Sequence, residues 1–419
     1  MSSQSQRPVS RRSSTTIFYG LALGSGVLRT FSVGFDIYAI NALNVNPLIY
    51  GFLAQWVSFL VVIVSVSVLS IRRTVEGRRQ ALGYTLDPDF DRLHVLPKKP
   101  MLYLVASGFF AGISTLFYYI LTGTSDASAV LPYGQLVIIY LLMGDLVAEK
   151  DTPTIIEVQS IISILFGVLL IGATPSGFDL TSLLIVLGPM NISSAFVTYY
   201  QRKTKRYEIR PGLRVDSLNM RVWSLLVLNS VLSLFLFPML PADAWQIMID
   251  DFAILLIPMI GSATTIFLAL VMYARALGRG SMSIVNSLSA VSVVLGVPMT
   301  LIGNALLPGA FGDIETDLFM WTLTILGIIL VMIGILALQA SDVRSYVIVK
   351  VKPQVGDILP DLFKIKGVER AAALAGMHDY ILTIKSRNLA KTRTKILKRI
   401  QEVKGIDKIE TLVIIRDYR

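Results

Sequence analysis

Two charged side chains lie inside the first long apolar stretch of the chain. Residues 16–40 include Arg29 and, seven residues later, Asp36. A charge at the centre of a bilayer costs roughly 2.5–3.5 kcal/mol on insertion scales, so such a residue is a candidate for function by default. Seven residues are about two helical turns, which predicts that both side chains share one helix face. Arg29 could fix an anionic group of a substrate, and Asp36 could bind a cation or a proton.

Two structural roles stay open for this pair. Either residue could be paired with a partner on another apolar stretch, and Asp36 could simply reach the outer membrane interface. Other polar residues in apolar stretches could line the same cavity, since Pro132 frees a backbone carbonyl that must face protein or water. They could equally serve as contacts between helices or as interface residues. These candidates are Tyr118, Tyr119, Tyr133, Gln135, Asn191, Tyr273, Asn286 and Ser287.

Four further charged residues lie close to the ends of apolar stretches. Arg221 and Arg275 are expected to extend toward the headgroups, because a long side chain can carry its charge to the interface. Asp145 and Glu149 are expected to be hydrated.

Ten apolar stretches of membrane-spanning length would carry these residues. A helix crosses the hydrocarbon core with about 20 residues. The predicted spans are 16–40, 47–70, 101–122, 127–147, 154–173, 180–200, 218–239, 252–274, 281–304 and 319–340.

The loops between these stretches alternate in charge. Every second loop lacks Lys and Arg, and the remaining loops hold the basic residues, with the longest at 72–99. Positive charge stays on the cytoplasmic side of a membrane. The pattern therefore predicts a multi-pass protein of the plasma membrane with both termini in the cytoplasm.

Composition narrows the class further. The chain is 54% hydrophobic and 16% charged, against about 25% charge in soluble domains, so the lipid bilayer is the expected solvent. It has no cysteine and two histidines, His94 and His378, which excludes Cys-ligated metals and thiol catalysis. No Walker A loop and no hydrolase signature is present. We expect no enzyme activity, no cofactor, no metal and no ATP-driven transport.

The ten predicted spans divide into five and five. Because five is odd, the second half starts from the opposite side, so the halves, 16–173 and 174–341, would be inverted repeats. At an offset of 155 residues, Tyr118, Gly123, Ser128 and Val130 match Tyr273, Gly278, Ser283 and Val285.

A small soluble domain is predicted for residues 342–419, after the polar N-terminus 1–15 and the two repeats. Residues 346–352 alternate as a half-buried strand does. A short helix near 358–363, strands at 369–375 and 380–385, a helix over 389–403 and a strand at 409–415 follow. This is the βαββαβ order of ferredoxin-like α+β domains. Its basic helix is expected to face solvent beside the anionic leaflet, with no nucleic acid bound.

The membrane region resembles the drug/metabolite transporter superfamily, in its EamA-like branch. The resemblance rests on two five-span halves, on the tight Gly/Ser turn between the third and fourth span of each half, and on the segment Gly144–Lys150 at the end of the fourth span. It implies an all-α membrane domain that transports a small molecule. The long loop at 72–99 departs from compact members.

The tail resembles the effector-binding module of Lrp/AsnC-type regulators, on the segments Tyr346–Val351, Ile365–Val368, Gly376–Leu382, Val403–Ile406 and Ile409–Thr411. The resemblance implies that the tail binds an amino-acid-like effector and associates as a homo-oligomer. Gly376, His378, Asp379 and Tyr380 could shape the effector pocket, or could form only a polar turn. The leading expectation is a secondary transporter or exporter with a regulatory tail. A membrane-anchored sensor, or a tail that only mediates oligomerisation, stays open.

Overall fold

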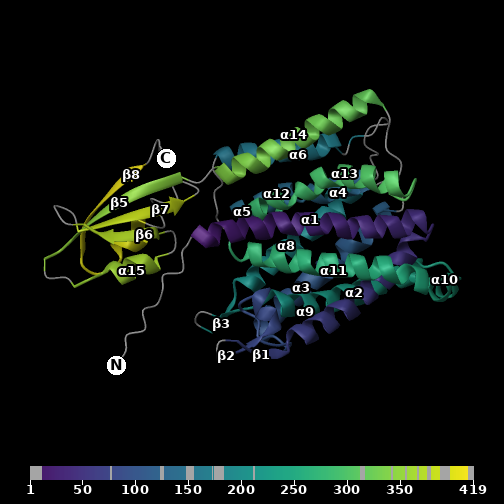
Figure 1. The fold of residues 1–419 in the computed structure, drawn as a ribbon, viewed down its shortest axis with the longest axis horizontal. Helices are drawn as coiled ribbons and strands as arrows, with labels where there is room; N and C mark the ends of the chain where they lie inside the picture. Colours follow the sequence, from purple (N-terminus) through teal and green to yellow (C-terminus); the bar gives the residue numbers. More distant parts are fainter. Residues whose placement is uncertain are drawn as a thin grey trace. The chain divides into compact units, whose positions relative to one another are not determined.

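Apolar helices make up most of the chain, and a small sheet domain follows them (Figure 1). The structure is a computed structural model. It describes all residues except 1–11, 76–77, 123–126, 148–154, 172, 174–183, 211–212, 312–316, 341–342, 354–355, 366–367, 375–378, 387–396 and 414–419. The chain divides into two units. The larger, helical unit comprises residues 14–152 and 160–335, and the smaller comprises 1–13, 153–159 and 336–419.

Seven of the described helical segments are long and apolar enough to cross a membrane. They coincide with predicted spans, and they indicate a multi-pass membrane protein. They are α1 (Arg12–Ala42), α2 (Pro47–Leu69), α3 (Lys98–Thr122), α9 (Ser217–Leu236, extended by the 3-10 turn Phe237–Met239), α11 (Phe252–Leu277), the pair α12 (Met282–Ser289) and α13 (Val291–Leu306), and α14 (Leu318–Ala340).

The other three predicted spans are helical but shorter or interrupted. The fourth is broken into α4 (Ala127–Gln135), which contains Pro132, and α5 (Ile138–Val147). The fifth is α6 (Ile155–Ile171). The sixth contains a π-helical turn, Val186–Met190, where Gly188 leaves helical geometry next to Pro189, and continues as α8 (Asn191–Lys205). Proline lacks the backbone donor that an unbroken helix needs, which accounts for the interruption at Pro189.

The fourth span (α4–α5) and the ninth span (α12–α13) are both divided in the middle, and they lie side by side in opposite directions. The first half of one packs on the second half of the other, since α4 contacts α13 and α5 contacts α12. The α12–α13 break falls at Ala290, and the α4–α5 break at residues 136–137. Helices α6 and α14 also meet closely, because a Cβ built on Gly167 would lie 2.5 Å from the carbonyl oxygen of Gly327. Only glycine allows that backbone approach.

The long loop between α2 and α3 is folded. It forms a hairpin of β1 (Arg72–Val75) and β2 (Arg78–Ala81) and then a 3-10 turn, Leu82–Thr85. A second, shorter hairpin, β3 (Glu208–Arg210) with β4 (Leu213–Arg214), joins α8 to α9, and α10 (Ala244–Asp250) precedes α11. Gly83 has no room for a Cβ, which would lie 2.5 Å from the ring of Phe90, so the loop packs against itself.

The smaller unit contains the predicted βαββαβ order. Its elements are β5 (Val343–Val351), α15 (Leu359–Lys364), β6 (Val368–Ala373), β7 (Tyr380–Ser386), α17 (Leu397–Gln401) and β8 (Ile406–Val413). The strands form one antiparallel sheet in the order β6-β7-β5-β8. The predicted inward face is confirmed, because Val347 and Val349 are fully buried with Leu362 and Ile400. The first part of the predicted basic helix lies outside the described residues.

Candidate functional site

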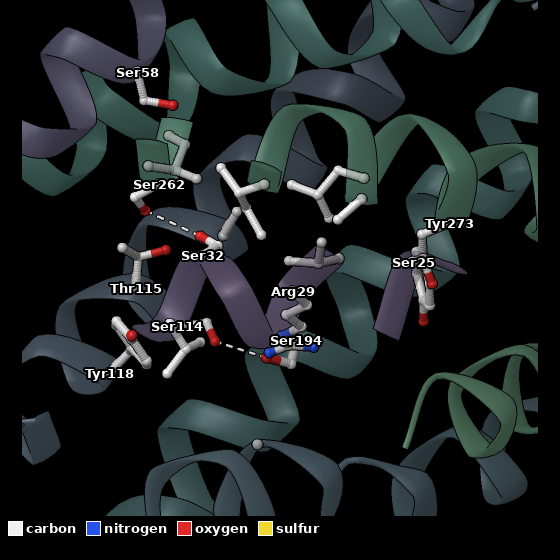
Figure 2. A pocket seen from close by; sticks show the side chains of 18 of the residues that line it. Ser25, Arg29, Ser32, Ser58, Ser114, Thr115, Tyr118, Ser194, Ser262 and Tyr273 are labelled. Carbon is white, nitrogen blue, oxygen red and sulfur yellow. Dashed lines mark hydrogen bonds between the residues drawn. The ribbon is translucent and has the colours of Figure 1, made fainter. Parts of the chain in front are cut away.

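A polar cavity of about 240 Å³ lies inside the helical unit. Figure 2 shows side chains from several helices turned toward one space. The described polar and charged lining residues are Ser25, Arg29, Ser32, Asp36, Gln55, Ser58, Ser114, Thr115, Tyr118, Tyr119, Ser194, Thr198, Gln201, Arg221, Ser262, Tyr273, Asn286 and Ser289. Ligand sites for drug-sized molecules measure about 300–1,000 Å³. The cavity therefore suits a smaller metabolite.

Helix α1 presents its polar face to the cavity. Ser25, Arg29, Ser32 and Asp36 all line it, at steps of four, three and four residues, as one face of a helix requires. Arg29 lies at the middle of the span Thr16–Ala42. The predicted common face of Arg29 and Asp36 is confirmed.

Asp36 is 7% exposed and bonded to two tyrosines. The Tyr50 hydroxyl donates to Asp36 Oδ1 at 2.8 Å, and the Tyr118 hydroxyl donates to Oδ2 at 3.3 Å. Both tyrosines lie on other spans, α2 and α3, so Asp36 has the kind of structural partners that its alternative role requires, although no described Lys or Arg forms an ion pair with it. A carboxylate has about four acceptor positions, which leaves room for a further donor.

Six of the ten predicted cavity residues line this cavity: Arg29, Asp36, Tyr118, Tyr119, Tyr273 and Asn286. The other four are Tyr133, Gln135, Asn191 and Ser287, and they do not line it. Gln135 accepts from Asn286 Nδ2 at 3.0 Å, and Asn191 donates to the carbonyls of Tyr133 and Val186 at 2.9 and 2.8 Å. These are contacts between and within helices, the role left open for them, and Ser287 is fully buried. Substrate binding by the first six stays a prediction.

Small hydroxyl residues are the part of the lining that sequence reasoning missed. Two pairs join different helices across the cavity wall: Ser32 and Ser262 at 3.0 Å, and Ser114 and Ser194 at 2.7 Å (Figure 2). The sequence does contain a pattern that could have identified part of this lining. Ser194, Thr198 and Gln201 are polar residues at helical spacing, as the lining residues of α1 are. Serine inside an apolar helix is common, so single residues carried little weight.

The expectation for Arg221 was wrong. This residue lies in the first turns of α9, but its side chain is 9% exposed and lines the cavity. Its Nε has no hydrogen-bond partner among the described residues. Arg275 donates to the carbonyl of Leu86 in the folded loop and does not line the cavity.

Asp145 was expected to be hydrated, and this too was wrong. Its side chain is 3% exposed and forms an ion pair with Arg202 at 2.6 Å. The same carboxylate accepts from the backbone nitrogens of Met282 and Ser283 at 3.1 and 2.7 Å and from Ser283 Oγ at 2.7 Å. It thus caps the N-terminus of α12, where negative charge is stabilised by the helix dipole. Glu149 lies outside the described residues.

A second buried ion cluster joins the folded loop to the ends of α8 and α9. Lys205 Nζ donates to Asp87 at 2.8 Å, to Asp89 at 3.0 Å and to the carbonyl of Val215 at 2.9 Å. The backbone nitrogen of Ser217 donates to Asp87 at 2.7 Å. Burial by itself would raise the pKa of Asp87, but Lys205 and Ser217 outweigh it and hold the pKa below its usual value.

Asp216 caps α9 next to this cluster. Its Oδ1 accepts from the backbone nitrogen of Asn219 at 2.7 Å, and its Oδ2 from Asn219 Nδ2 at 3.0 Å. Burial raises the pKa of Asp216 to about 6, although these two hydrogen bonds oppose the shift. The neighbouring charge of Asp87 adds to the increase.

The predicted effector residues are only partly described. Gly376 and His378 lie outside the described residues. Asp379 Oδ2 accepts from the backbone nitrogen of Val351 at 2.6 Å, and the Tyr380 hydroxyl donates to Asp357 at 3.3 Å. The first bond joins the ends of β5 and β7, and the second joins the start of β7 to the loop before α15. Effector binding by these residues stays a prediction. Within the described parts of the chain, no group of three His, Cys, Asp or Glu side chains is placed to hold a metal ion.

Comparison with known proteins assigns the tail. Residues 344–419 match the family of the Lrp/AsnC ligand binding domain, so the chain ends in a domain of this type. No EamA-type family matches the helical region. No curated protein matches the chain. A solved structure described only as "Crystal structure of protein" is similar over 78% of this chain and 96% of its own, at 16% identity and a TM-score of 0.48. That likeness carries no functional conclusion.

Proposed function

We propose that the chain is a secondary transporter or exporter of small metabolites, amino acids among them, in the plasma membrane, and that its tail senses an amino-acid-like effector. The observation that carries the proposal is the cavity within the helical unit, whose wall combines Arg29, Arg221 and Asp36 with hydroxyl groups from several helices. Intramembrane charges facing a cavity are typical of substrate and ion pathways.

The arrangement of broken helices supports a transporter of the inverted-repeat type with ten spans. Discontinuous helices that cross at a midplane site recur in secondary transporters. Here the antiparallel pair α4–α5 and α12–α13 breaks at residues 136–137 and at Ala290. The offset of 155 residues found in the sequence carries residues 136–137 to 291–292, within two residues of the second break. In this proposal both termini are cytoplasmic, as the basic loops predict.

The second candidate is a membrane-anchored small-molecule sensor, in which the helices anchor the tail or transmit its signal. The match of residues 344–419 to a ligand-binding domain favours it. A regulated transporter needs more than effector binding, because the effector must bind one transport state better than another. In either case the tail is proposed to associate as a homo-oligomer.

Flux in proteoliposomes separates these two functions. The full chain is reconstituted and tested with a panel of radiolabelled amino acids and small organic acids. For a transporter we expect counterflow of at least one solute, and Arg29→Ala should reduce it more than tenfold, because hydrogen bonds to charged groups contribute about 1.5–3 kcal/mol. Arg73→Ala, on the exposed hairpin, is the matched control. Effector binding with no flux of any solute would favour the sensor instead.

A further inference from the structure

The charge of the cavity wall is unbalanced. Among the described residues that line it, the charged ones are Arg29, Arg221 and Asp36. This gives two positive charges against one negative charge. An excess of positive charge in the wall of a cavity disfavours a cationic ligand and favours an anionic one.

Both arginines lack protein partners among the described residues. Arg29 and Arg221 have no ion pair and no side-chain hydrogen bond there, whereas Arg202 and Lys205 each reach a carboxylate within 3.0 Å. The contrast shows that this fold neutralises the buried cations Arg202 and Lys205 but not the buried Arg221 or the partly buried Arg29. A buried charge without a partner is destabilising. A guanidinium left in that state presents a fork of donors that matches a carboxylate in geometry.

Asp36 is not free to neutralise both arginines. Its two oxygens already accept from Tyr50 and Tyr118, and it lies two turns of α1 from Arg29, about 10 Å along the helix axis at 1.5 Å per residue. The remaining lining is made of hydroxyl and amide groups, which can bond a polar ligand without adding charge.

We infer that Arg29 and Arg221 form a subsite for a small organic dianion, with one carboxylate held by each guanidinium. The inference rests on the proposed function and narrows its substrate class. Asp36 then remains able to accept from an ammonium group, so acidic amino acids and plain dicarboxylates share the two-carboxylate chemistry that the subsite recognises.

The test compares succinate with its monoamide, succinamate, on the purified full chain. The two ligands match in size and differ in one carboxylate. Binding is measured by calorimetry and flux by counterflow in proteoliposomes. We expect succinate to bind about 10- to 100-fold more tightly than succinamate, the factor that one hydrogen-bonded charge supplies. Equal binding of the two by the wild-type chain would overturn the inference, and this comparison requires no variant to fold.

Variants then assign the preference to Arg221. Arg221→Gln should remove the preference for succinate over succinamate, and Arg221→Lys should keep part of it, because lysine retains the charge but loses the fork. Arg73→Gln, an exposed arginine outside the cavity, should leave it unchanged. Retention of the full preference in Arg221→Gln would also overturn the inference. L-glutamate and L-glutamine, compared in the same way, show whether an ammonium group adds affinity.

The outcomes for this inference and for transport are distinct. Arg221-dependent succinate binding without any flux would support the subsite and count against the transporter. Flux of a neutral or cationic solute without succinate binding would support the transporter and refute the subsite.

Discussion

Substitution of Asp145 by asparagine tests whether the buried Asp145–Arg202 pair stabilises the helical unit. The two side chains are 2–3% exposed, and their charged atoms lie 2.6 Å apart. The amide side chain would keep a neutral acceptor for the first nitrogens of α12, so the cap is weakened and not lost. The larger effect is the loss of the ion pair with Arg202, because removal of one partner of a buried pair costs about 3–5 kcal/mol. We expect Asp145→Asn to lower the free energy of unfolding by about 3 kcal/mol.

The assay is SDS titration in mixed micelles, followed by the fluorescence of the four tryptophans. The double variant Asp145→Asn/Arg202→Met removes the positive charge of the pair as well. It should therefore be less destabilised than the sum of the two single variants, by about 0.5–3 kcal/mol of coupling. The reasoning would be refuted if the free energy of unfolding of Asp145→Asn lay within about 0.5 kcal/mol of the wild-type value. It would also be refuted if the destabilisation of the double variant equalled the sum of the two single variants.

Two further predictions concern packing and pH. Gly167→Ala should destabilise the helical unit by about 1–3 kcal/mol, because the new Cβ would lie 2.5 Å from the carbonyl oxygen of Gly327, whereas Gly20→Ala, with nothing within 4 Å, should not; equal SDS midpoints would contradict this. In the folded protein the pKa of Asp216 is raised from 3.8 to about 6. The protonated carboxyl therefore contributes to the free energy of unfolding below pH 4, and this contribution, about 3 kcal/mol at 1.36 kcal/mol per pKa unit, is lost as pH rises through 6. Asp216→Asn should flatten this part of the stability–pH profile measured by thermal unfolding, and an unchanged slope would reject the assignment.

The sequence predicted those features of the fold that are determined within a single helix or strand. The strand β5 was predicted because alternation in one short segment determines which face is buried, and Val347 and Val349 are buried as predicted. The shared face of Arg29 and Asp36 followed from helical spacing alone. In both cases one element carries the whole signal.

Contacts between distant elements were not predictable in the same way. Arg221 and Asp145 lie near helix ends, where hydration is the usual outcome, and their depth is set by neighbours remote in sequence. Asp145 is buried because Arg202 and the start of α12 reach it. The loop after β2 folds over the ends of α8 and α9, where its Asp87 meets Lys205. These partners are remote in sequence, so no pattern within one segment predicts them.

The chain between α14 and β5 is very short. Helix α14 ends at Ala340 and β5 begins at Val343, so three Cα–Cα steps of 3.8 Å allow at most about 11 Å between them. Strand β5 lies inside its sheet, between β7 and β8, and α14 is held against α6 where Gly327 meets Gly167. A movement that would carry the start of β5 farther than about 11 Å from Ala340 must therefore also move the last turn of α14.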